Sequence, residues 1–191
     1  MYLFLKRLFD FSLALIILFW GLPFLLVLYV ALKLRNDSGP VIHWSKRIGQ
    51  NRAIFLMPKF RTMKCNTPQV ATHLLGSAES YLTNSGAFLR KSSLDEVPQL
   101  YSILVGDMSF VGPRPALFNQ DDLMELREKY DVDKLKPGLT GWAQINGRDD
   151  LPVAIKVDYE KEYDLKKNFL FDLKILCLTF FKVLKQDNIQ H

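Results

Sequence analysis

The chain has 191 residues and a formal net charge of +5, with 49% hydrophobic and 24% charged residues. This composition supplies enough apolar side chains for a folded core and excludes a chain that is disordered over most of its length. Its two cysteines and three histidines are scattered along the sequence, which argues against a disulfide framework or a zinc site. Any catalytic metal would be a hard ion held by oxygen, with magnesium (Mg²⁺) the first choice.

Residues 11–32 form an apolar segment without a formal charge, long enough for a helix that crosses a bilayer. Pro23 lies near its middle, where a proline removes a backbone donor and bends the helix. Basic residues flank both ends, so the charge asymmetry that orients a spanning helix is missing: Lys6, Arg7, Lys33 and Arg35. We expect a kinked, re-entrant helix with both ends on the cytosolic face; an ordinary single span with a tolerated proline is the alternative.

A secretory signal peptide is excluded because the apolar run is too long and ends in Lys33-Leu34-Arg35 rather than in small residues. We therefore divide the chain into a re-entrant membrane helix hairpin, residues 1–38, and one cytosolic domain, residues 39–191. Residues 1–64 contain ten Lys/Arg and two acidic residues, a net charge of +8, whereas the remainder carries −3. Such a basic region favours anionic headgroups or a phosphorylated ligand, and no nucleic-acid module accompanies it.

Short elements of both kinds follow the membrane segment. Residues 41–46 and 54–63 are typical of a strand pair, and residues 66–86 of a surface excursion with a short helix near 78–82, whose role the sequence does not reveal. Residues 96–105 predict a helix that stops at Gly106, a residue favoured just past a helix end.

The second half of the chain continues this mixed pattern. Residues 118–130 predict a helix with an acidic, solvent-facing side. Turn signals within residues 136–148 predict a hairpin or tight loop, and residues 169–185 predict an interfacial amphipathic helix that is basic on its wet side. The expected fold class is α/β: a monotopic membrane protein whose small globular domain has short strands, interfacial helices and no large parallel sheet.

Lys59 and Arg61 are two residues apart, so on a strand both side chains project from the same face. Two cations aimed at one point suit an anionic ligand such as a diphosphate, because arginine can hold two oxygens and lysine acts as a point charge. A solvated basic strand edge explains the pair equally well.

Asp95 and Glu96 fall at the start of the helix predicted after residue 94. Free N–H groups and the helix dipole stabilise a carboxylate or a bound phosphate at that position. A structural explanation competes, in which Asp95 is an N-cap or Ser93 and Glu96 form a capping box.

Arg114 lies between Pro113 and Pro115. Two flanking prolines fix the backbone and lower the entropy lost when the guanidinium is held in place, which suits oxyanion or nucleotide recognition as well as a stiff surface turn. Arg90, five residues before Asp95, can supply another positive charge.

Taken together, these segments resemble the bacterial sugar transferase family of small monotopic phosphoglycosyl transferases, over essentially the whole chain. The resemblance is carried by the kinked N-terminal segment and by five ordered motifs: Lys59 to Met63, Ser93 to Leu100, Gly106 to Pro115, Pro137 to Arg148, and Phe171 to Ile175. The chain departs from the family at the helix break, where many members have Ser-Pro and this chain has Leu22-Pro23. Losing that hydroxyl bears on the angle of the hairpin more than on the chemistry.

The resemblance implies transfer of a sugar 1-phosphate from a UDP-sugar to undecaprenyl phosphate at the cytosolic face of the bacterial inner membrane, as the first step of surface glycan synthesis. It implies Asp95 as nucleophile, Glu96 as magnesium ligand and a covalent aspartyl-phosphosugar intermediate with release of UMP. The remaining positions implied to contact substrate are Lys59, Arg61, Arg90, Arg114, Gln144, Arg148 and Asp172, with Gln144 and Arg148 near the nucleotide.

A membrane-tethered scaffold without catalysis, whose basic face binds anionic lipid or a partner protein, is the alternative from another functional class. A homo-oligomer is compatible with the sequence. The identity of the sugar and the glycan pathway depend on pocket contacts that no motif encodes.

Overall fold

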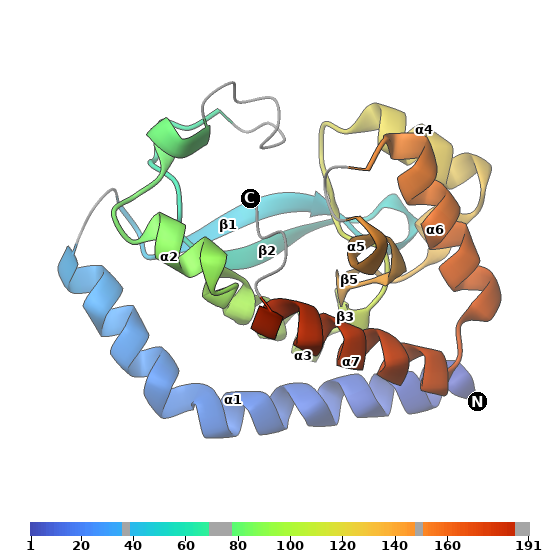
Figure 1. The fold of residues 1–191 in the computed structure, drawn as a ribbon, viewed down its shortest axis with the longest axis horizontal. Helices are drawn as coiled ribbons and strands as arrows, with labels where there is room; N and C mark the ends of the chain where they lie inside the picture. The colour runs from blue at the N-terminus through green and yellow to red at the C-terminus, as the bar shows by residue number, and fades with distance from the viewer. Residues whose placement is uncertain (36–38, 69–77, 148–150, 186–191) are drawn as a thin grey trace.

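The structure is a computed structural model that describes residues 1–35, 39–68, 78–147 and 151–185. A long N-terminal helix, α1 (Tyr2–Arg35), runs along one side of a mixed helix and strand body (Figure 1). The body contains, in chain order, β1 (Ile42–Ile48), η1 (Gln50–Arg52), β2 (Ile54–Phe60), η3 (Ala78–Tyr81), α2 (Gly86–Lys91), η4 (Leu94–Gln99), α3 (Leu100–Val105), β3 (Ser109–Val111), β4 (Ala116–Leu117), α4 (Asp121–Lys129), η5 (Val132–Lys134), β5 (Gly138–Thr140), α5 (Trp142–Asn146), α6 (Val153–Lys166) and α7 (Phe169–Lys185), where η marks a 3-10 helix.

The strands of the described residues form two small sheets. β1 and β2 make the antiparallel pair that the sequence predicts, and β4 joins the other edge of β1. β3 pairs with β5 in parallel. The prediction of short strands without a large parallel sheet is therefore confirmed for the described part of the chain.

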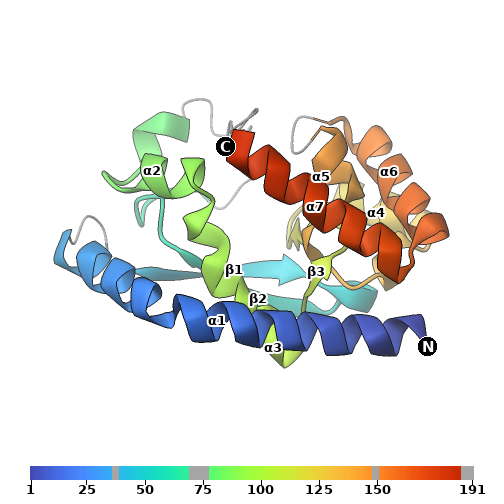
Figure 2. The ribbon, with the colours of Figure 1, turned by 60° about the horizontal axis from the view of Figure 1, so that its bottom comes forward.

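α1 is the one helix of the described chain that is long and apolar enough to cross a membrane. It continues through Pro23, and Figure 1 shows that it bends near its middle, as an interior proline predicts. Its first half packs on the body, where Ala14 joins an apolar core with Ile103 of α3 and Ile175 of α7. α1 contacts both α3 and α7, and Figure 2 shows it passing in front of α3.

The predicted helix at residues 96–105 is real but consists of two parts, the 3-10 helix η4 and then α3. Gly106 ends α3 with a φ of 98°, a left-handed conformation that glycine adopts without strain. The helices predicted at residues 118–130 and 169–185 are confirmed as α4 and α7.

The hairpin predicted within residues 136–148 is wrong. β5 pairs with the distant strand β3, and residues 142–146 form the helix α5. Pro137-Gly138 leads into β5, and Asn146-Gly147 ends α5, so the two signals mark element boundaries rather than the ends of a hairpin. Local turn chemistry could not reveal that pairing.

Glycines allow β3 and β5 to approach closely. A Cβ added at Gly138 would lie 2.1 Å from the backbone nitrogen of Gly112, and one at Gly141 would lie 2.1 Å from the carbonyl oxygen of Gly112. Only residues without a side chain permit this contact. It brings the segment that carries Arg114 against the segment that carries Gln144.

Gly138→Ala is expected to lower the free energy of unfolding by about 2 kcal/mol or more, because the new methyl group must separate β3 from β5. Gly21→Ala is the matched control, since nothing lies within 4 Å of a Cβ added at Gly21 and alanine favours helix. Denaturant unfolding of both variants in detergent measures the difference. Equal stability of the two variants would contradict the close approach.

Candidate active site

Asp95 and Glu96 lie in the first turn of η4, next to β2. The residue before this helix, Ser93, has a φ of 55° and makes no side-chain capping bond. The capping explanations for Asp95, Glu96 and Ser93 are therefore wrong. Neither carboxylate is explained by helix capping.

The Asp95 side chain is held almost entirely out of water, since only 6% of the residue is exposed. Its Oδ1 atom has no hydrogen-bond partner among the described residues. Burial raises the pKa of the Asp95 carboxyl to about 6. Lys59 opposes this rise most strongly and Glu96 adds to it, while Arg90 and Arg114 also oppose it. The site thus holds a costly, under-bonded carboxylate among three cations.

Glu96 has the opposite environment, because its Oε1 atom accepts two charged donors. The Nζ atom of Lys59 lies 3.1 Å away and the Nη2 atom of Arg114 lies 3.2 Å away. Burial lowers the pKa of Lys59 from its usual range. β2, η4 and the segment before β4 therefore meet at the Glu96 carboxylate.

The other two predicted cations lie in different places. Arg90 of α2 donates from Nε to the Thr62 hydroxyl at 3.1 Å, and its charge favours the Asp95 anion. Arg61 instead donates from Nε to the Pro40 carbonyl at 2.8 Å. β2 ends at Phe60, so the strand alternation that would have aimed Arg61 beside Lys59 does not continue.

The backbone around Arg114 is fixed more thoroughly than its two prolines predict. Three consecutive carbonyls each accept a donor from a different element: Pro113 from Gly138 N at 2.8 Å, Arg114 from Arg127 Nη2 at 2.9 Å, and Pro115 from Arg47 Nη1 at 3.2 Å. A backbone held at three successive carbonyls cannot rotate freely. The Arg114 backbone is thereby fixed, and its side chain bonds to Glu96 from this fixed position.

Arg127 is itself held by a buried ion pair that the sequence did not reveal. Its Nε atom donates to Glu160 Oε2 at 2.8 Å, and both side chains are almost fully buried between α4 and α6. An arginine on an acidic helix is normally solvent-exposed, and no local signal distinguishes this one.

A cavity of about 390 Å³ opens beside Glu96 and Arg114. Its walls are mostly apolar, from Ile17 of α1, Leu176 and Phe180 of α7, and Phe110. Gln144 lines it as well, with its Nε2 atom donating to the Leu139 carbonyl at 3.2 Å and its buried Oε1 atom without a partner in the described chain. Lys182, which the sequence analysis did not single out, also lines the cavity and donates to the Ile145 carbonyl.

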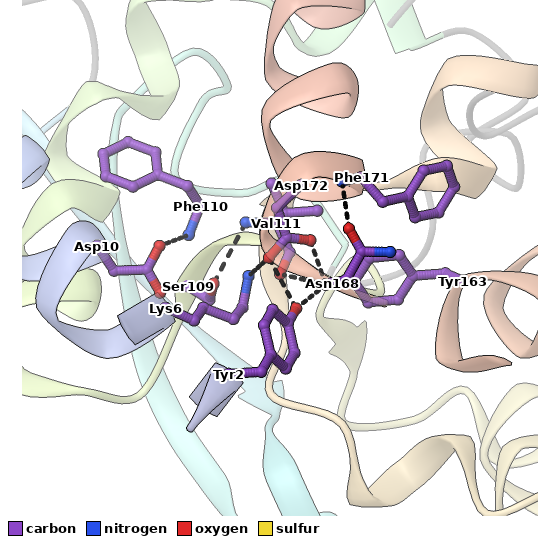
Figure 3. Close-up of polar contacts among 10 residues, drawn as sticks. All are labelled: Tyr2, Lys6, Asp10, Ser109, Phe110, Val111, Tyr163, Asn168, Phe171 and Asp172. Atoms are coloured by element: carbon purple, nitrogen blue, oxygen red, sulfur yellow. Dashed lines mark hydrogen bonds and ion pairs between the residues drawn. The ribbon is translucent and has the colours of Figure 1, made fainter. Parts of the chain in front are cut away.

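Asp172 lies elsewhere. Figure 3 shows its carboxylate facing Tyr2, Lys6 and Tyr163, and it does not line the cavity. Arg148 lies outside the described residues. The structure therefore brings together five of the predicted residues, which are Lys59, Arg90, Asp95, Glu96 and Arg114, places Gln144 in the adjoining cavity, and does not bring Arg61 or Asp172 to Glu96.

A magnesium ion fits the donor set at the start of η4. No group of three or more His, Cys, Asp or Glu side chains converges in the described part of the chain. Magnesium commonly takes one or two carboxylates and completes its shell with water and substrate phosphate, so it does not need such a group. Asp95 Oδ1 has no hydrogen-bond partner among the described residues, and Glu96 places a second carboxylate beside it.

The site combines a buried carboxylate, three cations and an adjoining cavity with mostly apolar walls, which suits an enzyme that acts on an anionic substrate. The family model described as bacterial sugar transferase matches residues 1–186. The chain belongs to the bacterial sugar transferase family and is by that membership a transferase.

Three relatives show the range of the similarity. The uncharacterized sugar transferase EpsL of Bacillus subtilis is 39% identical over 97% of this chain and 90% of its own length. The undecaprenyl-phosphate galactose phosphotransferase of Salmonella typhimurium is 36% identical over 96% of this chain and 41% of its own length. The UDP-glucose:undecaprenyl-phosphate glucose-1-phosphate transferase of Escherichia coli is 40% identical over 93% and 40%, respectively. The chain thus spans about two fifths of the two relatives whose names state a reaction.

Asp95→Asn is expected to stabilise the protein at neutral pH in the presence of a chelator. The carboxyl ionises near pH 4 in an unfolded chain but at about pH 6 in the fold, so wild-type stability falls as the pH rises between these values. The gain from Asn should grow from near zero at pH 4 to about 2–3 kcal/mol above pH 6. Denaturant unfolding across this range measures it, and a gain that is independent of pH would contradict the burial argument.

Arg127→Met is expected to cost about 3–5 kcal/mol of stability, because Glu160 then remains buried without its partner. The double variant Arg127→Met with Glu160→Met should recover most of that loss. Arg52→Met, which breaks an exposed pair with Glu128, is the control and should cost less than about 1 kcal/mol. A double variant no more stable than Arg127→Met would show that the buried charge is not the cause.

Proposed function

We propose that this protein transfers a sugar 1-phosphate from a UDP-sugar to undecaprenyl phosphate. The observation that carries the proposal is the buried, under-bonded Asp95 carboxylate, held among Lys59, Arg90 and Arg114 at the edge of an apolar cavity. Two relatives named for this type of reaction support the choice of donor and acceptor. Transfer to this lipid is the initiating membrane step of surface glycan synthesis.

In the first step, an Asp95 carboxylate oxygen attacks the phosphorus that bears the sugar. The new oxygen–phosphorus bond forms as the bond to the UMP oxygen breaks, and UMP leaves with that electron pair. Attack of an anion on a diphosphate meets charge repulsion, which Lys59, Arg90 and Arg114 offset by facing the same region. Burial leaves the Asp95 carboxylate poorly solvated, which raises its pKa to about 6 and makes the anion reactive at neutral pH.

In the second step, a phosphate oxygen of undecaprenyl phosphate attacks the phosphorus of the aspartyl phosphosugar. The bond to Asp95 breaks, the carboxylate is restored and the lipid diphosphosugar leaves. Separate steps let a water-soluble donor and a lipid acceptor use one site in turn. The apolar walls beside Arg114 suit the acceptor, since an isoprenoid phosphate joins an anion to a hydrocarbon chain.

Magnesium would be held by Glu96, with Asp95 the other available carboxylate. When bound, it supplies positive charge to the diphosphate oxygens and weakens the bond to the leaving group. The contacts of Glu96 with Lys59 and Arg114 keep its carboxylate oriented toward this region.

We infer that the protein is monotopic, with residues 1–38 as a re-entrant membrane hairpin and 39–191 as a catalytic domain on the cytosolic face of the bacterial inner membrane. Both ends of α1 contact the same body, because Arg7 donates to the carbonyls of Ile103 and Leu104 and Arg35 lies 3.4 Å from the Ser85 hydroxyl. A helix crossing the bilayer would carry one end away from the body. In Figure 1 the body lies on one side of α1, which leaves the other side for lipid.

α7 completes the proposed membrane surface as an interfacial helix. Leu170, Phe180 and Phe181 are 76%, 62% and 59% exposed, although they are large and apolar. α7 contacts α1, so both helices can face the same lipid layer.

Asp95→Asn is expected to reduce transfer of radiolabelled sugar phosphate to lipid, and the accompanying UMP release, by about 1000-fold or more. An amide cannot act as the nucleophile, and the neighbouring Glu96 carboxylate is paired with Lys59 and Arg114. The assay uses membranes containing undecaprenyl phosphate and a panel of UDP-sugars. Asp121→Asn, on the exposed side of α4, is the control and should retain wild-type activity.

Intact-mass spectrometry of wild-type protein given UDP-sugar without lipid should show an added phosphosugar on the peptide that contains Asp95. An adduct on another residue, or turnover that survives Asp95→Asn, would contradict the mechanism. Background signal from wild type with every sugar would instead favour the membrane-tethered scaffold.

A further inference from the structure

The start of α1 is fastened to the start of α7 by a buried polar cluster, here called the Asp172 clasp: Tyr2, Lys6, Tyr163 and Asp172 (Figure 3). Asp172 Oδ2 accepts the Tyr2 hydroxyl and the Lys6 Nζ atom, each at 2.7 Å. Asp172 Oδ1 accepts the Tyr163 hydroxyl at 2.8 Å. Asp172 is only 4% exposed, so three donors compensate a charge that water does not reach.

The donors come from separate elements. Tyr2 and Lys6 belong to α1, and Tyr163 belongs to α6, while Asp172 lies in the first turn of α7. The Tyr163 hydroxyl also lies 3.5 Å from the Val111 carbonyl of β3. Desolvation, with Asp172 nearby, raises the pKa of Tyr163, so its hydroxyl keeps the proton that it donates. The clasp therefore fixes α1 and α7 relative to each other and to the small parallel sheet.

The helices fastened by the clasp form two walls of the cavity. Ile17, about three helical turns beyond Lys6 on α1, lines it from one side. Leu176 and Phe180, one and two turns beyond Asp172 on α7, line it from the other. A small change in the angle between α1 and α7 at the clasp therefore produces a larger change in the distance between Ile17 and the α7 side chains, because these lie farther along the two helices.

The cavity walls made by α1 and α7 are mostly apolar, with Thr179 and Lys182 of α7 as polar members. The cations that face Asp95 come instead from β2, α2 and the segment before β4. A nucleotide sugar is polar, so contact with these apolar side chains would stabilise its binding little. An isoprenoid chain needs them, because they remove its hydrocarbon from water.

On this basis, which rests on the proposed function, we propose that Tyr2, Lys6, Tyr163 and Asp172 are positioning residues for the lipid acceptor: the clasp sets the spacing of the α1 and α7 walls that hold the isoprenoid end of undecaprenyl phosphate. The residues touch neither the donor nor the reacting phosphorus. The clasp therefore governs the second chemical step and leaves the first unchanged.

The test separates the two steps in the full-length protein in nanodiscs. The first step alone is followed by exchange of labelled UMP into UDP-sugar without lipid acceptor, and the second by transfer to undecaprenyl phosphate at several concentrations. Tyr163→Phe and Lys6→Met should keep the exchange rate within about twofold of wild type, while the rate of transfer at low acceptor concentration falls about tenfold and the KM for acceptor rises. Tyr130→Phe removes a hydroxyl from the residue that follows α4, which does not line the cavity, and should change neither step.

Retained exchange also shows that each variant is folded. An unchanged acceptor KM and transfer rate in both variants would overturn the proposal. An equal loss of exchange and transfer would overturn it too, because it would mean a general structural role. Absence of exchange in wild type would instead refute the covalent mechanism on which the inference rests.

Discussion

The architecture depends on keeping one carboxylate out of water without giving it a full set of partners. Burial of Asp95 costs free energy that three neighbouring cations only partly offset, as its raised pKa shows. Such a group remains reactive only if the surrounding frame is rigid, because any relaxation would bring in a donor or water. Much of what surrounds η4 serves that rigidity.

The frame around Arg114 illustrates how the rigidity is built. Two prolines restrict the backbone, three successive carbonyls are bonded to three different elements, and Arg127 is fixed in turn by Glu160. The glycine contact between β3 and β5 sets how near the two motif-bearing segments can approach. Stability that the buried carboxylate removes is thus restored by hydrogen bonds and packing at a distance from it.

α1 both packs against the body and exposes large apolar side chains on its other sides. One side of its first half packs on the body, with Ala14 buried and Asp10 accepting the Phe110 amide. Large apolar side chains are nevertheless exposed along the whole helix, from Leu3 and Phe4 near its start to Leu34 near its end. In the proposed monotopic arrangement, α1 is both a wall of the body and a membrane element, so its position sets the depth of the body at the lipid surface. The Asp172 clasp fastens the first residues of α1 to α7.

Features with local signals could be predicted from the sequence: the long apolar helix with its proline, the strand pair of β1 and β2, and the helix end at Gly106. The motifs also identified Asp95, Glu96 and Arg114 as candidate site residues. The sequence could not determine which segments pair, so the turn signals near Gly138 predicted a hairpin where β5 joins β3. Nor could it separate Lys59 from Arg61, or reveal Arg127, Glu160 and Tyr163, because burial and partners are properties of distant contacts. These pairings and buried contacts are visible in the fold alone, because hydrogen bonds between residues 13 to 170 positions apart produce no periodic pattern in the sequence.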